Sequence, residues 1–455
     1  MIRTRMTAAA PITRDARLPG AVSGGDSDDT LLEKIQHEAF GYFIKHGNPG
    51  NGLVCDSTMP DAPASIAVVG FALSGYPVAV ERGWMQRSDA LARTLAALRF
   101  FHDADQSGAV DGIGHHGFFY HFLDMHRGRR AWASELSTID TTLLVAGMLV
   151  AARYFDHDDA EEREVRAKAA AIYERVDWRW AQNGGRAPTM GWTPEHGFLR
   201  YRWIGYNEAL ILYVLALGSP SHPLQPDAYA QWLSGFRWKR IYGHAHVYAG
   251  PLFIHQFSQI WIDCRGLKDA YMAPKNIDYF ENSRRATYVH HEYASRNPKR
   301  FEDYHGRCWG LTASDGPGPA KRIHHGRKRK FYDYRARGAP FGPDDGTVAP
   351  WAAIASLPFA PELVMPMLHY LSEQTGSAPE AVAFDFYTSF NPTYHVRRGD
   401  AGWVSRRHYG LHQGPMVLMI ENYRNGLLWR LMRESPPVVR GLRRAGFTGG
   451  WLDLA

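Results

Sequence analysis

The chain has 455 residues, of which 45% are hydrophobic and 22% are charged, and its formal net charge is +6. These values describe an ordinary globular protein with a large core, and 52 basic residues against 46 acidic ones give only a mild positive bias. Cys55, Cys264 and Cys308 are too few and too scattered for a disulfide framework or a thiolate metal site. We expect them to be reduced and buried. The aromatic content of 13% is less usual and suggests stacking surfaces for sugars or bases, although aromatic side chains also fill cores.

The first 29 residues lack the apolar core of about 7–15 residues that a secretory signal needs, and we expect them to be disordered. No apolar run of about 18 residues is free of charge, glycine and proline, so no membrane span is expected. As it stands, the sequence predicts a cytoplasmic protein.

Two kinds of helix alternate along the chain. One kind is apolar on all sides and should be buried, over 63–77, 137–155, 205–218, 250–263, 345–361 and 412–426. The other kind is amphipathic, over about 30–46, 88–101, 159–180, 225–233, 283–296 and 361–374. The alternation predicts an all-α fold, an (α/α)6 barrel of six inner and six outer helices. An α-solenoid is the competing fold, but no period of about 30–50 residues recurs. No linker divides residues 30–455, which we predict to form a single domain.

Two acidic residues stand at matching places, each at the entrance of an apolar helix. Asn207 can cap the helix over 205–218, which puts Glu208 in its first turn, and Asp140 begins the helix over 137–155 in the same way. If the inner helices run parallel, both carboxylates face one cavity, which is the minimum equipment for glycoside hydrolysis. For either residue alone a helix cap is the simpler explanation. For the two together, beside aromatic loops, catalysis is favoured.

The stretch 242–317 is rich in polar and aromatic residues that suit a sugar, with groups for vicinal hydroxyls and flat rings for C–H faces. The candidates for substrate binding are His255, Gln256, Asp263, Arg265, Asn282, Arg284, Trp309 and Asp315. For Asp263 an internal ion pair with Arg265 is an equally good explanation, because a buried charge needs a partner.

The 22 histidines do not follow the spacing of a known zinc motif, and pairs such as His324 and His325 are predicted to be solvated loop residues, so no metal site is expected. The basic segment 321–330 could contact a nucleic acid or another anionic polymer, but no base-reading motif accompanies it. A solvated loop is the simpler interpretation. The chain also lacks the motifs of serine hydrolases, P-loop NTPases and Rossmann enzymes.

Nine strings of the sequence, in order from about Leu31 to Trp429, resemble the bacterial glycoamylase-like family, which includes the endo-β-1,2-glucanases of glycoside hydrolase family 144. They are IQHEAFGYF, GFALSGYPVAVERGW, ELSTIDTTLLVAGML, YNEALILYVLALGSPSHP, GPLFIHQFSQIWIDCRG, DYFENSRRAT, WGLTASDGP, DDGTVAPWAAIASLPFAPE and QGPMVLMIENYRNGLLW. The resemblance implies an (α/α)6 barrel and metal-independent cleavage of β-1,2-glucan with inversion. It also implies that Glu208 is the general acid and that Asp140 is a catalytic or glucan-binding carboxylate. Members of the family are often exported.

The chain departs from the family pattern at two positions, where relatives usually carry aspartate and this sequence has His412 and Thr388. Asp385 lies three residues before Thr388 and partly compensates for it. The group that orients the attacking water molecule of the hydrolysis is therefore Asp140, Asp385 or His412. His412 is included because an imidazole can also activate water near neutral pH.

The sequence as a whole predicts a glycoside hydrolase that acts on β-linked glucan without a cofactor, most simply an endo-β-1,2-glucanase. The partner is then an oligo- or polysaccharide, with no nucleic acid and no membrane. A glucosyl transferase or an exo-acting enzyme on the same scaffold is the nearest alternative, and a non-catalytic glucan-binding protein is the alternative from another class.

Overall fold

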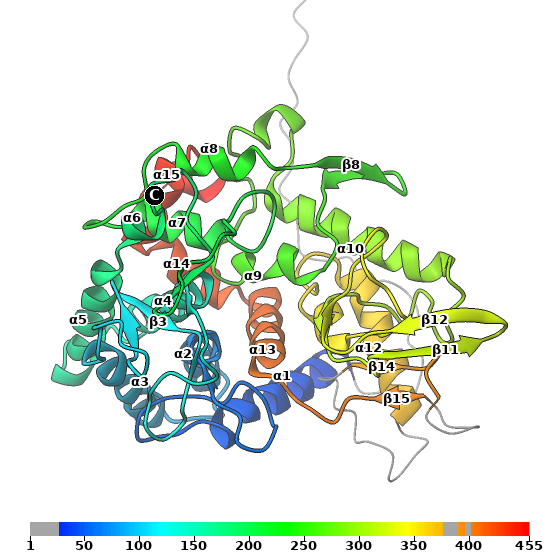
Figure 1. Cartoon of the computed structure of the whole chain (residues 1–455), viewed down its shortest axis with the longest axis horizontal. Coiled ribbons are helices and arrows are strands. Elements are labelled where there is room, and N and C mark those ends of the chain that lie inside the picture. Colours follow the sequence, from blue (N-terminus) through cyan, green and yellow to red (C-terminus); the bar gives the residue numbers. More distant parts are fainter. Residues whose placement is uncertain (1–26, 376–388, 396–401, 455) are drawn as a thin grey trace, which may run out of the picture.

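The computed structural model describes residues 27–375, 389–395 and 402–454, and these are largely helical (Figure 1). At the centre of this part of the chain lie six helices whose side chains are buried on nearly every side. They are α2 (Ile66–Glu81), α4 (Thr138–Tyr154), α7 (Leu210–Gly218), α9 (Phe253–Trp261), α11 (Pro350–Ile354) and α13 (Gly410–Arg424). Each lies within one of the six ranges predicted to be inner helices or overlaps it. A helix without a polar face is stable only when other elements surround it, so these six form the core.

The inner helices pack on one another in chain order. Helix α2 packs on α4, α4 on α7 and α7 on α9, while α13 packs on α2, α9 and α11. The rings of Phe71 and Phe257 are 5.7 Å apart, and close to one turn later along both helices the Trp261 indole donates to the Ser74 hydroxyl at 2.9 Å. From the first contact to the second, the residue number rises in both helices, so α2 and α9 run parallel. Their N-terminal ends therefore lie at the same end of the core.

The closest contact in the core is between the backbones of α2 and α4. A Cβ atom on Gly70 would lie 2.2 Å from the carbonyl oxygen of Leu143, and a Cβ atom on Gly147 would lie 2.1 Å from the carbonyl oxygen of Gly70. No side chain fits at such distances, so glycine at both positions sets how closely the two helices approach.

A second group of helices covers the core. It comprises α1 (Asp28–Lys45), α3 (Arg87–His102), α5 (Ala160–Arg175), α8 (Ala228–Leu233), α10 (Tyr279–Arg296) and α12 (Pro361–Thr375), and the chain adds α6 (Trp178–Ala181), α14 (Leu427–Arg433) and α15 (Pro436–Arg444). Helix α1 begins at Asp28, two residues before the predicted start at about residue 30, because the Ser27 hydroxyl accepts a hydrogen bond from the Thr30 N–H and caps the helix.

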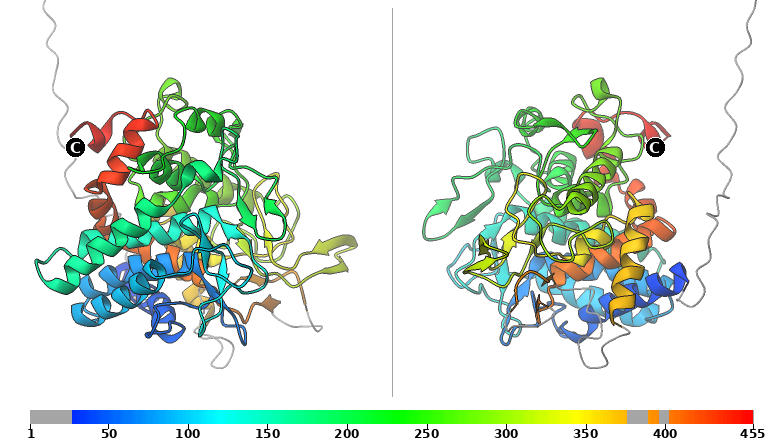
Figure 2. Two further views of the ribbon diagram at one scale, coloured as in Figure 1. Left: turned by 60° about the vertical axis from the view of Figure 1, so that its left-hand side comes forward. Right: turned by 90° about the vertical axis from the view of Figure 1, so that its right-hand side faces the viewer.

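Short strands lie in the loops, so the all-α prediction was incomplete. One antiparallel sheet has the order β2 (Gly114–His115), β3 (Phe118–Tyr120), β5 (Leu136–Ser137), β6 (Gly191–Thr193), β7 (Gly197–Phe198). The others are pairs: β1 (Ala64–Ser65) with β4 (Phe122–Leu123), β8 (Trp238–Ile241) with β9 (His244–Val247), β10 (Ala313–Ser314) with β13 (Arg335–Ala336), β11 (Ala320–His324) with β12 (Arg327–Phe331), and β14 (Phe390–Asn391) with β15 (Trp403–Val404). The hairpin of β11 and β12 projects from the body of the molecule (Figures 1 and 2).

The mostly helical class is therefore confirmed, whereas the complete (α/α)6 barrel stays a prediction because two of its members are short. Helix α8 has 6 residues and α11 has 5, the latter ending well before the predicted residue 361, where the N–H groups of Ser356, Leu357 and Phe359 donate to carbonyls three residues back instead of four. Cys264 and Cys308 are buried as expected, but Cys55 is half-buried. In the described residues, no helix has both the length and the apolar character to cross a lipid bilayer.

We expect Gly147→Ala to lower the free energy of unfolding by about 1–3 kcal/mol, because the added methyl group pushes α4 away from α2. Gly41→Ala in α1 is the matched control, since a Cβ atom there meets nothing within 4 Å and should add about 0.5–1 kcal/mol. Urea unfolding measures both. An equal or higher midpoint for Gly147→Ala would contradict this account of the contact.

Candidate active site

Asp140 and Glu208 lie close enough for their charges to interact. Asp140 is the third residue of α4 and is 8% exposed, and Glu208 is a half-buried residue in the turn before α7. Burial and, to a smaller extent, the negative charge of Asp140 raise the pKa of Glu208 to about 7. The structure thus brings these two carboxyl groups together at one end of the core, as their places in the sequence predict.

Asp140 is not itself the cap of its helix. Ser137 is the N-cap residue of α4, and its hydroxyl accepts a hydrogen bond from the Asp140 N–H at 3.2 Å. The same hydroxyl donates to Asp140 Oδ2 at 2.5 Å and so fixes the direction of the carboxylate. Because one serine satisfies the helix terminus, the other oxygen of Asp140 remains available for other contacts.

Glu208 lies before its helix, and the prediction that it belongs to the first turn was wrong. The Asn207 side chain accepts the Ala209 N–H at 3.2 Å and the Trp232 indole N–H at 3.0 Å, which makes a tight turn and delays the start of α7 to Leu210. The Ser258 hydroxyl of α9 donates to the Glu208 carbonyl at 2.6 Å. Two neighbouring inner helices therefore hold the backbone of Glu208.

His121 lies between two carboxylates because of the register of a small sheet. Strands β3 and β5 pair Tyr120 with Leu136, so the next residues, His121 and Glu135, are adjacent. His121 Nδ1 is 3.0 Å from Glu135 Oε1, and its Nε2 is 3.6 Å from Asp140 Oδ2. Burial opposes the charged form of this imidazole, but the charges of Asp140, Glu135 and Asp56 outweigh it and raise the pKa of His121 to about 9. His121 is therefore a cation at neutral pH.

Asp56 is a further buried carboxyl group beside His121 and Asp140. Burial raises the pKa of Asp56 to about 6, with a smaller contribution of the same sign from Asp140 and an opposite one from His121. Its carbonyl accepts the N–H of Gly410 at 2.8 Å, which joins this loop to the first residue of α13. Groups that keep a proton near neutral pH beside groups that do not are the usual equipment of acid–base catalysis.

Asp315 belongs to a second polar group near the first. Its carboxylate accepts hydrogen bonds from the hydroxyls of Tyr409 and Ser405, each at 3.0 Å. Burial and the charge of Asp315 raise the pKa of Tyr409, so this hydroxyl stays a donor. The ring of Tyr334 is 5.6 Å from that of Tyr409, and the charge of Asp56 acts on Tyr334, which connects the two groups.

His412 lies behind Tyr409 and is 3% exposed. Its ring stacks on Trp351 with the centroids 4.7 Å apart, and it lies 5.1 Å from the ring of Tyr409. The candidate Asp385, like Thr388, is outside the described residues.

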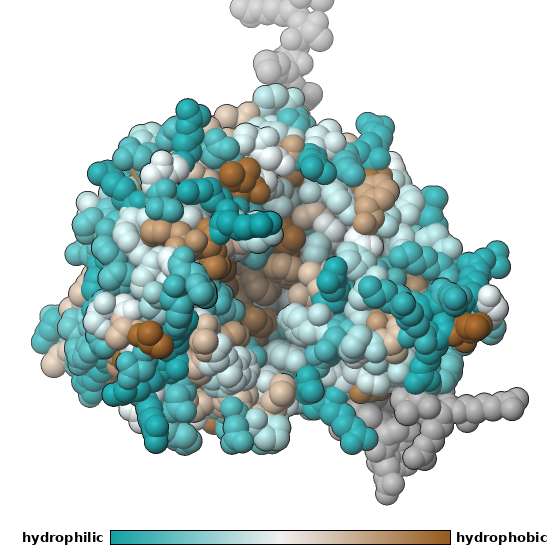
Figure 3. Space-filling view, viewed as in Figure 1, coloured by the Kyte–Doolittle hydropathy of each residue, from teal (hydrophilic) through white to brown (hydrophobic). Residues whose placement is uncertain are grey.

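The face of the molecule seen in Figure 1 is hollowed near its centre, where α9 and α13 are drawn, and hydrophobic residues line the deeper part of the hollow (Figure 3). An apolar recess with a few polar groups is the usual form of a small-molecule or sugar site.

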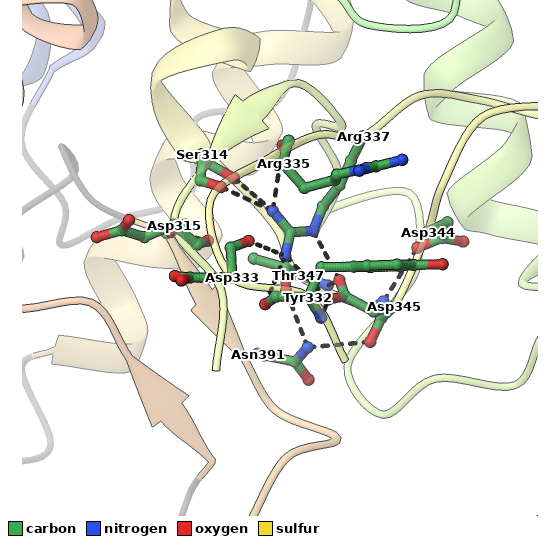
Figure 4. A network of polar contacts seen from close by, with 12 residues as sticks. Ser314, Asp315, Tyr332, Asp333, Arg335, Arg337, Asp344, Asp345, Thr347 and Asn391 are labelled. Carbon is green, nitrogen blue, oxygen red and sulfur yellow. Dashed lines mark hydrogen bonds and ion pairs between the residues drawn. The ribbon is translucent and has the colours of Figure 1, made fainter. Parts of the chain in front are cut away.

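A buried arginine holds the loop that carries Asp315 and Tyr334. Arg337 and Asp345 are both fully buried, and the guanidinium donates to the two oxygens of Asp345 at 2.7 and 2.9 Å and to the Ser314 carbonyl at 2.8 Å. Figure 4 shows Asp315 at the edge of this network. These hydrogen bonds satisfy both buried charges and tie the loop to Asp345.

Three of the predicted substrate-binding residues are instead part of the core. Gln256 is fully buried and donates to the Ala352 carbonyl at 2.6 Å, which joins α9 to α11. His255 and Asn282 are also buried, and the Asn282 side chain accepts the Val247 N–H at 2.7 Å. Each of these side chains thus has a structural contact, and its role in substrate binding stays a prediction.

Four further residues predicted to bind substrate lie elsewhere in the structure, and their roles stay predictions. Asp263 and Arg265 follow the C-terminal end of α9 and form the internal ion pair, at 2.7 Å, that was the alternative for Asp263. Trp309 is fully buried, and Arg284 of α10 pairs with Glu362 of α12 at the surface. Of the eight residues predicted to bind substrate, Asp315 alone lies among the groups around Asp140 and Glu208.

Two groups of side chains in the described residues have the composition of a metal site, although the sequence predicted none. They are Glu302, His324 and His395, and His157, Asp159 and Glu162. Both are separate from the groups described above.

Sequence reasoning missed Asp56, His121, Glu135, Tyr334 and Tyr409. Four of these lie in long loops between the predicted helices: His121 and Glu135 in 102–136, Tyr334 in 302–346 and Tyr409 in 375–411. Glu135 also opens the string ELSTID that ends at Asp140. Long loops at one end of a rigid scaffold often carry function.

Comparison with known proteins decides the family. The glycoamylase model, described as "Putative glucoamylase", matches residues 200–436, which is more than half of the chain. The chain belongs to the glycoamylase family. The match includes the turn of Glu208, helices α7 to α13 and the loop of Asp315.

Two similar proteins are β-1,2-glucan hydrolases by name, and a third is a putative glucoamylase. An exo β-1,2-glucooligosaccharide sophorohydrolase (non-reducing end) of Parabacteroides distasonis is 27% identical over 95% of this chain, which spans 60% of that relative's length. The structure of an endo-β-1,2-glucanase from Chitinophaga pinensis, in complex with sophorotriose and glucose, is 26% identical and has a TM-score of 0.79 over 93% of this chain and 99% of that one. A putative glucoamylase from Bacteroides uniformis is 29% identical, with a TM-score of 0.82 over 94% of this chain and 100% of that one.

The stabilising contribution of His121 should depend on pH. Its pKa is raised from 6.5 to about 9, so the contribution is complete below pH 6.5 and is lost as the pH rises through 9. At about 1.4 kcal/mol per pKa unit, the difference in unfolding free energy between the wild type and His121→Gln should shrink by up to about 3 kcal/mol over that interval. Denaturant unfolding at several pH values measures it.

His369→Gln is the matched control, because His369 forms a largely exposed pair with Asp28 and should change stability little at any pH. A difference for His121→Gln that stays constant or grows with pH would mean that the imidazole is not held as a cation by its neighbours.

Proposed function

We propose that this protein is a glycoside hydrolase that cleaves β-1,2-linked glucan by acid–base catalysis, in endo mode and with inversion. The observation that carries the proposal is Glu208, a half-buried carboxyl group with a pKa raised to about 7 beside Asp140. The substrate class, β-1,2-glucan, is taken from the names of the similar proteins.

Glu208 is the general acid of this proposal. Cleavage of a glycosidic bond leaves an alkoxide unless a proton reaches the leaving oxygen, and a carboxylic acid with a pKa near the working pH delivers it best. Burial and the charge of Asp140 keep the proton on Glu208 near neutral pH. After bond cleavage Glu208 is an anion, and the proton of the attacking water restores its acid form through solvent.

Asp140 is proposed as the group that orients the attacking water, and it is the best candidate among the described residues. Its carboxylate faces the His121 imidazolium at 3.6 Å, and Ser137 fixes its direction. Asp385 remains a second candidate. His412 is proposed to support the site through Tyr409, because its ring is buried.

Asp315, Tyr409 and Tyr334 are proposed to contact the glucan. The carboxylate accepts sugar hydroxyls, and the exposed ring of Tyr334 offers a flat surface for C–H faces.

An exo-acting enzyme is the second candidate, and one observation favours it. The sophorohydrolase from P. distasonis matches 95% of this chain and is exo-acting by name. Incubation with linear and with cyclic β-1,2-glucan, followed by chromatography, distinguishes the modes. An endo enzyme opens the cyclic glucan and releases a range of oligosaccharides from the linear one. Sophorose alone, from linear glucan only, would establish the exo mode, and longer products would establish transfer.

Glu208→Gln should lower kcat by about 10²–10⁴-fold with little change in KM, because the amide retains the shape of the acid but carries no transferable proton. Glu174→Gln on the exposed side of α5 is the matched control and should keep wild-type activity. Release of reducing ends from β-1,2-glucan is the measurement.

The pH profile separates an acid from a binding residue. For the wild type, kcat/KM should fall as the pH rises above about 7, where Glu208 loses its proton. Glu208→Gln should lose this alkaline limb. Full turnover by Glu208→Gln, or a variant whose profile keeps the limb, would remove the assignment.

A further inference from the structure

Three side chains that could bind a metal ion lie close together although they are far apart in the sequence. They lie outside the proposed active site. Glu302 follows α10, His324 ends β11, and His395 follows β14. His324 Nε2 lies 3.1 Å from Glu302 Oε1, and His395 Nε2 lies 2.9 Å from Glu302 Oε2. The ligand atoms of the three residues all lie within 4.8 Å of one another.

The surrounding backbone holds these side chains in place. The N–H of Glu302 donates to the Thr393 hydroxyl at 2.8 Å, which fixes Glu302 beside the segment of His395. The imidazole rings of His324 and His395 are stacked, with an interplanar angle of 21°. His325 adds a further nitrogen, since its Nε2 lies 3.6 Å from Glu302 Oε1.

We propose that Glu302, His324 and His395 bind a divalent transition-metal ion, and that Zn²⁺ is the ion that fits best. Two imidazoles and one carboxylate are typical zinc ligands, with metal–ligand distances of about 2.0–2.2 Å. In a tetrahedral site these distances put ligand atoms about 3.3 Å apart. His324 Nε2 and His395 Nε2 lie 3.1 and 2.9 Å from different oxygens of Glu302, and the three ligand atoms lie within 4.8 Å of one another, so the side chains are close enough to converge on one ion. His325 or a water molecule completes the tetrahedron.

The second group with metal-ligand composition is less suited to bind a metal ion, because its carboxylates already form structural contacts. Glu162 forms two hydrogen bonds to the Arg87 guanidinium, at 2.8 and 2.9 Å, and Asp159 caps α5. Both carboxylates of that group therefore have a structural use already. By contrast, the ion-pair partners of Glu302 within the described residues are all imidazoles.

The metal would fasten three segments that flank the proposed active site. Strand β14 follows Ser389, whose hydroxyl donates to the Asp315 carbonyl at 2.7 Å, and β15 precedes Ser405, which donates to the Asp315 carboxylate. A metal at His395 thus stabilises the support of Asp315 without contacting substrate. This role is independent of the acid–base chemistry proposed for Glu208.

The test is zinc binding by the full chain after treatment with EDTA. We expect one equivalent of Zn²⁺ per chain by elemental analysis and a rise of several degrees in Tm when Zn²⁺ is added back. The double variant His324→Asn with His395→Asn should lose the bound equivalent and the rise in Tm, and Glu302→Gln should lose them in a folded protein that keeps all its imidazoles.

His305→Asn is the matched control, because His305 forms a simple pair with Asp303 at 2.8 Å and belongs to neither group. It should bind zinc as the wild type does. Binding of Co²⁺ in place of Zn²⁺ should give the visible absorption of a tetrahedral site. The proposal is overturned if the wild type binds no zinc, or if the double variant and Glu302→Gln bind as much as the wild type.

Discussion

Three carboxyl groups and one imidazole share a buried space at the end of the inner helices, and their mutual charge is the constraint on which the proposed function depends. Asp56 and Asp140 are buried and Glu135 is half-buried, and His121 is the cation beside them, at 3.0 Å from Glu135 and 3.6 Å from Asp140. Burial and, to a smaller extent, the charge of Asp140 act on Glu208 in the direction of the protonated form. One site thus holds carboxyl groups of unequal acidity.

Backbone packing and a buried ion pair give this space its shape. Gly70 and Gly147 let α2 and α4 approach to backbone contact, and Ser258 of α9 fixes the turn of Glu208. The hydrogen bonds of Arg337 to Asp345 and to the Ser314 carbonyl cross-link the loop with Asp315. Rigid helices and a cross-linked loop are what acid–base geometry requires.

The sequence predicted the buried helices well, but it did not predict most of the polar side chains around Asp140 and Glu208. The reasons are physical. Period and apolar content determine which helices are buried, and the position of Asp140 and Glu208 at helix entrances follows from that pattern. A polar residue inside an apolar helix has two possible uses, and Gln256 joins α9 to α11. The position of His121 depends on the register of strands of two or three residues, and the cluster around Glu302 on three distant segments. No local pattern in the sequence predicts the position of His121 or the cluster around Glu302.

The central claim is that Glu208 meets the scissile bond of a β-1,2-glucan. A crystal structure of the Glu208→Gln variant with a bound sophoro-oligosaccharide tests it most directly. The account predicts a glycosidic oxygen within hydrogen-bond distance of the side chain at position 208, with Asp140 facing the same sugar. An oligosaccharide bound elsewhere, or with its linkages turned away from both residues, would contradict it.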